Sequence, residues 1–161
     1  MTMWAAASAV LGAGEPVPAD SGPAPVRRML ERALAGPLAG CRELVFAVRS
    51  VGSDGHYYAN FGYYDNAPDK WAYGPDGGQL CKLDLHTGNL SVLLDDPQGG
   101  VRDPVVHYDA GKILFSYRRG GTPFYNLHEI KVDGSGLTPL TDGPFDDFEP
   151  TYLPDGDIVF V

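Results

Sequence analysis

Short apolar runs recur along the second half of the chain, each of them following a turn rich in aspartate and glycine. The run Ile113–Phe115 follows Asp109-Ala110-Gly111, and the run Ile158–Phe160 follows Asp155-Gly156. Asp-Gly and similar pairs favour tight hairpin turns because they tolerate a positive φ. The β-branched and aromatic residues of the runs favour strands. The pattern therefore predicts consecutive antiparallel hairpins.

The hairpins belong to a repeat. Leu83–Leu90 aligns with Ile130–Leu137 at an offset of 47 residues, and Asp103-Pro104 aligns with Glu149-Pro150 at an offset of 46. The prolines are expected at strand starts, where a missing N–H is tolerated. A weaker echo at Leu44-Val45-Phe46 predicts a first strand over residues 43–49. A spacing in the forties is typical of β-propeller blades.

The repeat also resembles a known family. Residues 141–160, with Glu149-Pro150 and Pro154-Asp155-Gly156, look like the blade motif of TolB-type propellers. Residues 99–119 are similar to propeller domains related to the middle domain of the hydrazine synthase alpha subunit. The resemblance implies an all-β fold over residues 41–161: a partial, truncated TolB-like propeller of about two four-stranded blades. The strand Ile158–Val161 has no partner following it, so we expect the isolated chain to self-associate.

The first forty residues have a different character. Residues 1–24 are rich in alanine, glycine and proline and are predicted to be a mobile leader or a degenerate signal peptide. Within residues 25–40 we expect one short helix, Pro25–Ala35, followed by a linker. The apolar residues of this helix share one face, which predicts packing on the propeller or on a preceding domain. The resemblance implies an extracytoplasmic (periplasmic or secreted) location.

Composition narrows the classes of partner. The formal net charge is −9, and lysines and arginines form no larger cluster than a pair, so nucleic-acid binding is not expected. No run of eighteen apolar residues is present, so the chain is not expected to span a membrane. The expected partners are another protein or the remaining propeller blades.

A long segment, residues 50–78, interrupts the repeat. It concentrates aromatic residues in a stretch with no clear strand pattern, and long loops of this kind are often functional. Tyrosine and tryptophan offer rigid contact area with a polar tip. The alternative is that the loop buries its rings against its own blade. The candidate ligand-binding residues in this segment are His56, Tyr57, Tyr58, Tyr63, Tyr64 and Trp71.

Arg118 is a further candidate, because it lies where two strands of a blade are joined. It could bind an anion or form an ion pair with Asp103 or Asp109. His107 and His128 fall in or beside predicted strands and are interpreted as hydrogen-bonded structural residues rather than metal ligands.

The acidic residues before the second copy of the motif form a cluster that could bind Ca²⁺ or could fix the turn between blades; we favour the turn. They are Asp142, Asp146, Asp147 and Glu149.

The two cysteines, Cys41 and Cys81, could pair in an extracytoplasmic protein, but the position of Cys81 between apolar residues favours a buried thiol. The sequence contains no Cys-x-x-Cys-His haem-attachment motif. No catalytic residue, metal site or cofactor is predicted; haem would have to come from other sequence or from a partner. The sequence thus favours a non-catalytic scaffold or binding module of a larger protein. The alternative is a fragment of a hydrazine-synthase-like haem oxidoreductase subunit.

Overall fold

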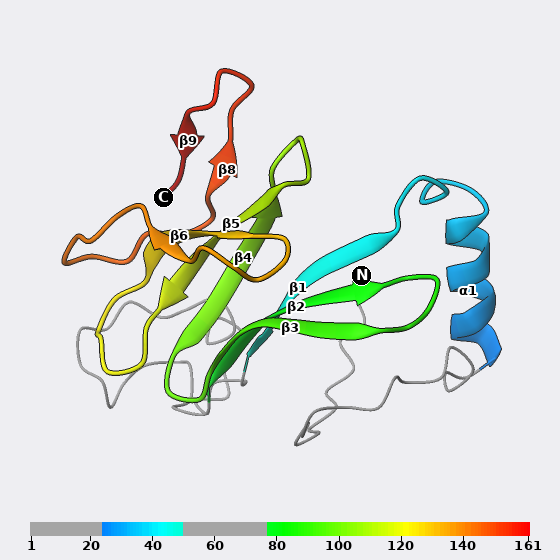
Figure 1. Cartoon of the computed structure of the whole chain (residues 1–161), viewed down its shortest axis with the longest axis horizontal. Coiled ribbons are helices and arrows are strands. Elements are labelled where there is room, and N and C mark those ends of the chain that lie inside the picture. The colour runs from blue at the N-terminus through cyan, green and yellow to red at the C-terminus, as the bar shows by residue number, and fades with distance from the viewer. Residues whose placement is uncertain (1–23, 50–76) are drawn as a thin grey trace.

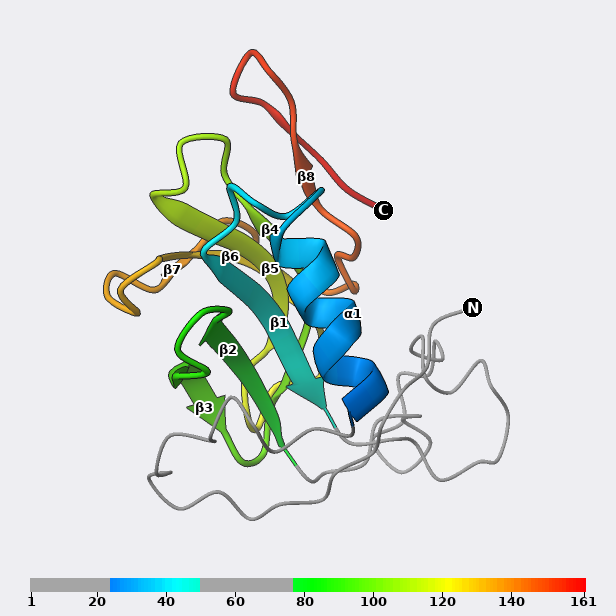
Figure 2. The same ribbon diagram turned by 90° about the vertical axis from the view of Figure 1, so that its right-hand side faces the viewer.

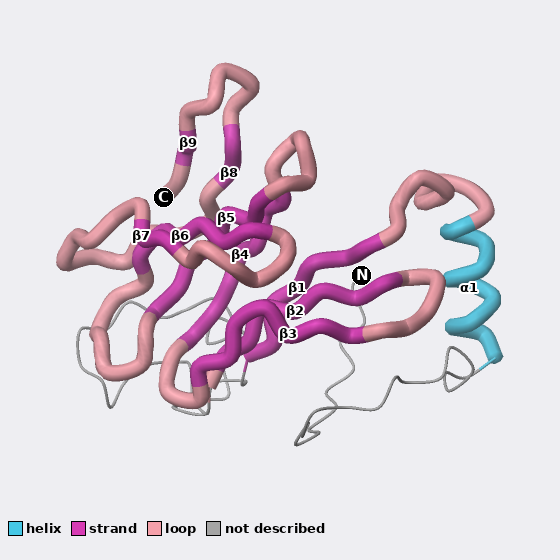
Figure 3. Tube along the Cα trace, in the orientation of Figure 1, coloured by secondary structure: helices cyan, strands magenta, loops and turns pink. Residues whose placement is uncertain are grey.

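The computed structural model describes residues 24–49 and 77–161 of the chain. The predicted leader and most of the aromatic segment lie outside these residues. The described part holds one helix and nine strands (Figures 1 and 3). These are α1 (Ala24–Leu34), β1 (Glu43–Arg49), β2 (Gly78–Asp84), β3 (Leu90–Asp96), β4 (Gly100–Val106), β5 (Lys112–Arg118), β6 (Asn126–Lys131), β7 (Thr138–Pro139), β8 (Thr151–Tyr152) and β9 (Ile158–Val159).

The strands form three antiparallel sheets that follow one another along the chain. The first has the order β1-β2-β3, the second β4-β5-β6-β7, and the third is the β8-β9 hairpin. We call these sheets blades 1, 2 and 3. The predicted all-β, partial propeller fold is therefore confirmed, but its strands are distributed over parts of three blades rather than two.

The predicted hairpin turns are present. In the β4–β5 turn the Asp109 carboxylate accepts a hydrogen bond of 2.8 Å from the Gly111 N–H, and Ala110 has φ 56°. In the β8–β9 turn the Asp155 carboxylate accepts a hydrogen bond of 3.2 Å from the Asp157 N–H, and Gly156 has φ 96°. A side chain that bonds the backbone two residues on stabilises such turns. The aspartate at each turn is therefore a determinant of the local fold.

Pro150 directly precedes β8, as the sequence predicts, but the position of Pro104 differs from the prediction. Pro104 lies inside β4 rather than at its start, at a bulge where the pairing with β5 shifts between Arg102 and Val105. A bulge tolerates proline because its residues leave the ladder of hydrogen bonds. The preceding residue, Asp103, has φ 53°, and its repeat counterpart Glu149 has φ 49°. The repeated acidic residue and proline thus encode a β-bulge.

The same bulge pattern recurs in blade 3. The Phe148 N–H donates to the Val161 carbonyl at 2.8 Å, and the Val161 N–H donates to the Phe148 carbonyl at 2.9 Å. After the bulge at Glu149, Thr151 pairs with Val159 and Tyr152 with Ile158. This reproduces the pairing of Arg102 with Ser116, Val105 with Leu114 and Val106 with Ile113. Residues 148–161 are therefore the inner hairpin of a third blade.

The core lies between successive blades. Leu80 of blade 1 and Val101, Ile113 and Phe115 of blade 2 are fully buried in one cluster. A second cluster joins Leu114 and Leu127 of blade 2 to Tyr152 of blade 3. Side chains on the two faces of blade 2 thus pack against blades 1 and 3, which is the packing expected for neighbouring propeller blades.

The helix α1 forms where the sequence predicts it, and its packing on a preceding domain stays a prediction. Val26, Met29 and Leu30 are exposed by 40–70% within the described part of the chain. Figures 1 and 2 show α1 at the end of blade 1 that holds the β2–β3 turn. The α1–β1 connection begins with a hydrogen bond of 2.8 Å from the Leu38 N–H to the Ala33 carbonyl. No helix among the described residues is long and apolar enough to cross a membrane.

The two cysteines are free thiols. Cys81 is buried on β2, as predicted from its apolar neighbours, and Cys41 is exposed in the connection before β1. Burial raises the pKa of the Cys81 thiol, and the nearby Asp95 carboxylate raises it further.

Candidate binding face

One end of the blades collects the connections that could carry function. At this end β1 stops at Arg49 and β2 begins at Gly78, so the aromatic segment emerges here. In blade 2 the equivalent positions are Arg118, at the end of β5, and Asn126, at the start of β6. We call this end the insertion end, and the opposite one, which holds the β4–β5 and β8–β9 turns, the turn end.

A cluster of arginine and aromatic side chains lies at the insertion end. The Arg102 guanidinium carbon is 4.1 Å from the centre of the Phe148 ring, and that of Arg118 is 5.8 Å from the Tyr125 ring. The two rings contact each other with their centres 5.3 Å apart. Arg102 and Arg118 are only 3% and 4% exposed. Because cation–π contacts strengthen on desolvation, this arginine–aromatic cluster joins the ends of β4, β5, β6 and the strand leading into β8.

Asp146 adds an acidic side chain to the arginine–aromatic cluster. Its carboxylate accepts a hydrogen bond of 2.8 Å from the Tyr125 N–H. Burial raises the pKa of Asp146, and this effect is opposed by that hydrogen bond and by the charges of Arg102 and Arg118. Burial also raises the pKa of the Tyr125 phenol, opposed by the same two arginines and by Arg49. The cluster therefore combines buried arginines with an acidic side chain at the insertion end.

Close backbone approach holds this end together. A Cβ atom added to Gly100 would lie 2.1 Å from the Tyr125 hydroxyl, and one added to Gly78 would lie 2.6 Å from the Val101 backbone nitrogen. Both glycines therefore permit contacts that a larger residue would block. Gly78 lets the start of β2 in blade 1 meet the start of β4 in blade 2.

Of the predicted ligand-binding residues, only Arg118 lies among those that the structure describes. Arg118 belongs to the arginine–aromatic cluster and donates a hydrogen bond of 3.4 Å to the Gln98 carbonyl. The acidic residues proposed as its partners bind elsewhere: Asp103 pairs with Arg102 at 2.6 Å, and Asp109 with His107 at 2.7 Å. The remaining candidates, which are His56, Tyr57, Tyr58, Tyr63, Tyr64 and Trp71, lie outside the described residues.

The strand histidines have structural partners, as the sequence indicates. The His107 ring meets the Tyr152 ring edge to face, with centres 4.7 Å apart, and forms the contact with Asp109. His128 Nδ1 lies 3.0 Å from the Asn126 carbonyl, and its ring contacts that of Tyr117 at 5.0 Å. Burial lowers the pKa of His128.

The acidic cluster before β8 serves the connection between blades 2 and 3. Asp146 binds the Tyr125 backbone, and the Asp147 carboxylate accepts a hydrogen bond from the Thr141 hydroxyl. The Asp147 N–H donates to the Tyr125 carbonyl at 2.9 Å. These contacts confirm the predicted structural role of the two aspartates. Across the described ranges, no group of three or more histidine, cysteine or acidic side chains is placed to hold a metal ion.

Sequence reasoning missed the hydrogen bonds that link blades. The Asp103 carboxylate accepts a hydrogen bond of 3.3 Å from the Glu149 N–H of blade 3. Asp96 of blade 1 accepts from the Tyr117 hydroxyl and the Gly120 N–H of blade 2, both at 2.7 Å. The sequence does contain the acidic residue that precedes each proline of the repeat. The repeat alone does not show that this residue bonds to the next blade.

A further link joins blades 2 and 3 near the turn end. The Tyr152 hydroxyl donates to the Glu129 carboxylate at 2.7 Å, and Lys112 contacts the same carboxylate oxygen at 2.7 Å. The Tyr108 hydroxyl donates to the Tyr152 carbonyl at 2.8 Å. Burial raises the pKa of the Tyr152 phenol well above its ordinary value, and the Glu129 carboxylate raises it further.

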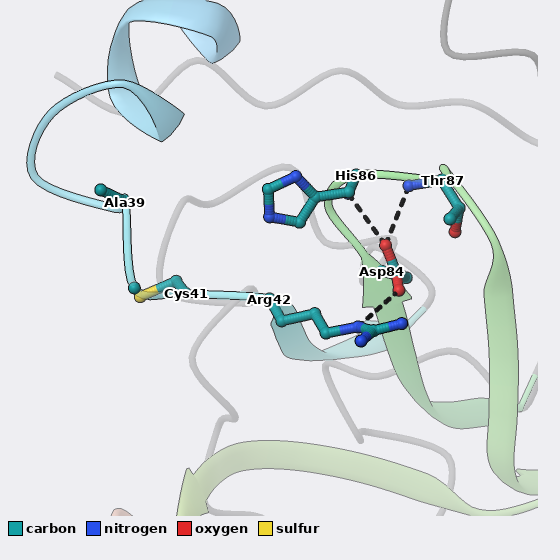
Figure 4. A pocket seen from close by; sticks show the side chains of 7 residues that line it. Ala39, Cys41, Arg42, Asp84, His86 and Thr87 are labelled. Atoms are coloured by element: carbon teal, nitrogen blue, oxygen red, sulfur yellow. Dashed lines mark hydrogen bonds and ion pairs between the residues drawn. The ribbon is translucent and has the colours of Figure 1, made fainter.

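An open pocket of about 400 Å³ lies at the turn end of blade 1, between the α1–β1 connection and the β2–β3 turn (Figure 4). The Asp84 carboxylate accepts hydrogen bonds of 2.9 Å from the His86 and Thr87 N–H groups and one of 3.2 Å from Arg42. These bonds lower the pKa of Asp84 to about 2. Its oxygens are thus engaged in forming the β2–β3 turn.

Comparisons with known proteins agree with the fold. No family model matches the chain. The hydrazine synthase subunit alpha of Kuenenia stuttgartiensis is 33% identical over 97 residues, which are 59% of this chain and 11% of that protein. This match confirms the predicted relationship with that subunit. The chain therefore spans about a tenth of the length of this relative.

Solved structures give the same picture. The hydrazine synthase of Kuenenia stuttgartiensis matches with a TM-score of 0.52 and 23% identity, over 74% of this chain and 16% of that one, and it shares the fold. A putative TolB from Agrobacterium tumefaciens aligns with a TM-score of 0.46 and 27% identity, over 52% of this chain and 29% of its own.

Proposed function

We propose that this chain is a non-catalytic β-propeller scaffold within a larger protein and that it presents a ligand- or protein-binding face at the insertion end. The observation that carries the proposal is the link between blades at the repeated bulge. Asp103 holds the Glu149 backbone of the next blade while it pairs with the buried Arg102. A motif that is repeated from blade to blade and used for joining blades serves architecture.

The other charged groups of the described core support the same role. Asp96 joins blades 1 and 2 through Tyr117 and Gly120. Glu129 joins blades 2 and 3 through Tyr152, and its pKa is lowered by hydrogen bonds from Lys112 and Tyr152 that outweigh the effect of burial. Charges held in such contacts rigidify a framework. A rigid framework is what a binding loop needs if its side chains are to be positioned.

The binding function is proposed for the aromatic segment, residues 50–78. Its tyrosines, tryptophan and His56 provide the amphipathic contact area that protein and sugar ligands use. Arg49, which precedes it, and Gly78, its last residue, lie at the same end as the arginine–aromatic cluster. We further propose an extracytoplasmic location and assembly with a protein partner, in keeping with a relative that is named as a subunit of hydrazine synthase.

The alternative, a haem oxidoreductase subunit whose propeller frames the cofactor, requires residues that hold haem. A c-type haem needs two cysteines separated by two residues and followed by histidine. Here Cys81 is buried on β2 while Cys41 is exposed before β1, forty positions earlier. These residues do not fit covalent attachment, so we propose that any haem of the larger protein is held outside this chain.

Visible spectroscopy of the larger protein tests the scaffold proposal against the alternative. Three variants remove the described histidines one at a time: His86→Ala, His107→Gln and His128→Gln. The proposal predicts either no Soret band or a Soret band whose intensity per mole of protein is the same in the parent and in all three variants. Loss of the band in any folded variant, with circular dichroism as the check of folding, would contradict it.

A further inference from the structure

The seam between blades 1 and 2 contains a histidine among aromatic side chains. His128 lies on β6 opposite Phe115 of β5, and the centres of the two rings are 6.2 Å apart. Its ring also meets the Tyr117 ring edge to face, with centres 5.0 Å apart. Phe115 and Tyr117 belong to the core cluster that includes Leu80 of blade 1, and β7 places the uncharged Pro139 opposite His128. His128 therefore packs on the rings that join the two blades.

The hydrogen bond of the His128 ring determines where a further proton can be added. Nδ1 lies 3.0 Å from the Asn126 carbonyl oxygen, which can only accept, so Nδ1 carries a hydrogen. In the neutral imidazole Nε2 is then unprotonated, and acidification adds a proton there. Within residues 24–49 and 77–161, Nε2 bonds no acceptor. The charged ring would therefore hold a second N–H in a partly buried site without a partner, which is costly.

The charges around His128 also oppose its protonation. Arg119, in the connection between β5 and β6, places a positive charge near the ring. The Asp96 carboxylate accepts its hydrogen bond of 2.7 Å from the Tyr117 hydroxyl rather than from the imidazole. Burial lowers the pKa of His128 and the Arg119 charge lowers it further, against the opposing effect of the Asn126 hydrogen bond.

The other titratable groups of the seam keep one charge state near neutrality. Burial acts to raise the pKa of Asp96, but hydrogen bonds from Tyr117, Gly120 and Gln98 outweigh burial and lower that pKa. Burial and the Asp96 carboxylate raise the pKa of the Tyr117 phenol. Asp96 is therefore ionised and Tyr117 neutral between about pH 5 and about pH 8, the range in which histidine changes its charge.

We propose that the seam between blades 1 and 2 is an acid-sensitive contact, in which protonation of His128 separates its ring from Tyr117 and loosens the β5–β6 connection. A histidine whose folded-state pKa lies below its unfolded-state value contributes stability above the unfolded-state value, and this contribution is lost as the pH falls. The loss begins near the ordinary histidine value of 6.5. Because Tyr117 also bonds Asp96, which accepts from the Gly120 N–H, the effect reaches the insertion end. The inference goes beyond the scaffold role and does not depend on the binding proposed for residues 50–78.

Nuclear magnetic resonance titration of the His128 ring in the 161-residue chain is the first test. We expect the ring to be half-protonated at a pH below 6.5. The midpoint should rise towards that value in Arg119→Gln, which removes the nearby positive charge. A midpoint at or above 6.5 in the parent chain would overturn the proposal. No substitution of His128 is needed for this titration, so it decides the matter even where such a variant does not fold.

Hydrogen exchange, corrected for the intrinsic effect of pH, tests the response of the seam. Between about pH 7.5 and about pH 5.5, we expect protection of the Tyr117 and Gly120 amides to fall at least about fivefold in the parent chain. His128→Gln keeps a hydrogen-bonding side chain that gains no charge, so protection should change less than about twofold. His86→Gln, in the exposed β2–β3 turn, should behave as the parent does. An equal pH dependence in the parent and in His128→Gln would overturn the proposal, as would a loss of protection confined to β8 and β9.

Discussion

Asp103 and Glu149 show how much one residue position determines in this protein. Both adopt a left-handed conformation, which costs a residue with a side chain roughly 1–2 kcal/mol. The residue after each is proline, which disfavours the right-handed helical region for the residue before it. At Asp103 the cost is offset by two contacts of its carboxylate, with Arg102 and with the Glu149 N–H. The position is strained, and its side chain stabilises the strained geometry.

Replacing Asp103 should therefore destabilise the fold more than an ordinary substitution. In Asp103→Ala the 3% exposed Arg102 loses its ion pair and the Glu149 N–H loses its acceptor. We expect the free energy of unfolding in urea to fall by about 2–4 kcal/mol, since the loss of a charged hydrogen bond to a buried guanidinium and the loss of a backbone acceptor are each costly. Asp103→Asn keeps an acceptor and tolerates the conformation, so it should lose less. Equal stability of the alanine variant and the parent would contradict the account.

Asp84 gives the fold a dependence on acid. Hydrogen bonds from the Thr87 and His86 backbone lower its folded-state pKa to about 2, from an ordinary value of 3.8. A lowered pKa stabilises the folded state above the unfolded-state value, and this contribution is lost as the pH falls through the folded-state value. The free energy of unfolding should therefore decrease from about pH 4 to about pH 2, and less steeply in Asp84→Asn. Identical slopes for the two proteins in acid titrations of urea unfolding would refute this assignment.

At the scale of elements, the sequence predicts hairpins better than it predicts their surroundings. The β4–β5 and β8–β9 turns follow from local signals, because the aspartate side chain bonds its own backbone. The sequence predicts a strand start at Pro104 where the structure has a bulge, since a proline is compatible with both and only the pairing partner distinguishes them. The exposure of α1 depends on what lies beside it, which its periodicity cannot show.

The candidate site, too, could be predicted from the sequence only in part. The sequence identifies Arg118 by its position at a strand end, but its contact with Tyr125 depends on a ring that reaches as far as Gly100 of β4, which only the folded blade reveals. The bonds by which Asp96 and Glu129 join blades could not be predicted, because the tyrosines that make them lie in neighbouring blades. Whether the aromatic residues of the inserted segment bind a ligand remains a prediction.

The link between blades 2 and 3 can be tested at its central side chain. Tyr152→Phe removes the hydroxyl that donates to Glu129 but leaves the ring against Leu114 and Leu127. Since Lys112 still pairs with Glu129, the expected loss is about 1 kcal/mol in the free energy of unfolding. Tyr108→Phe, which removes a hydroxyl bonded to the Tyr152 carbonyl, is a comparison at a 71% exposed position and should cost less. A larger loss for Tyr108→Phe than for Tyr152→Phe would contradict this ranking.

At the scale of the whole molecule, consecutive blades explain both the order of the core and the exposed surfaces. Blade 2 has neighbours on both faces and holds most of the fully buried side chains, including Ile113, Leu114 and Phe115. Blades 1 and 3 each have one described neighbour. Val159, Phe160 and Val161 of blade 3 are 43–73% exposed. The protein therefore presents apolar strand surface at its blade 3 side.

This surface should make the isolated chain self-associate. We expect light scattering coupled to size-exclusion chromatography to show a molar mass that rises with protein concentration, because free strand edges pair readily. Val159→Lys places a charge on β9 and should shift the population toward the monomer. Met29→Lys, at a 70% exposed position on α1, should leave it unchanged. A parent chain that stays monomeric at all concentrations would disprove the expectation.

The central claim is that residues 148–161 repeat the bulged inner hairpin of blade 2 and so begin a third blade. Cross-strand nuclear Overhauser effects in the isotopically labelled chain test it most directly. The account predicts contacts of Phe148 with Val161, Thr151 with Val159 and Tyr152 with Ile158, interrupted by a bulge at Glu149. These would parallel the contacts of Arg102 with Ser116, Val105 with Leu114 and Val106 with Ile113. Contacts in an unbulged register, or none between residues 148–152 and 158–161, would contradict it.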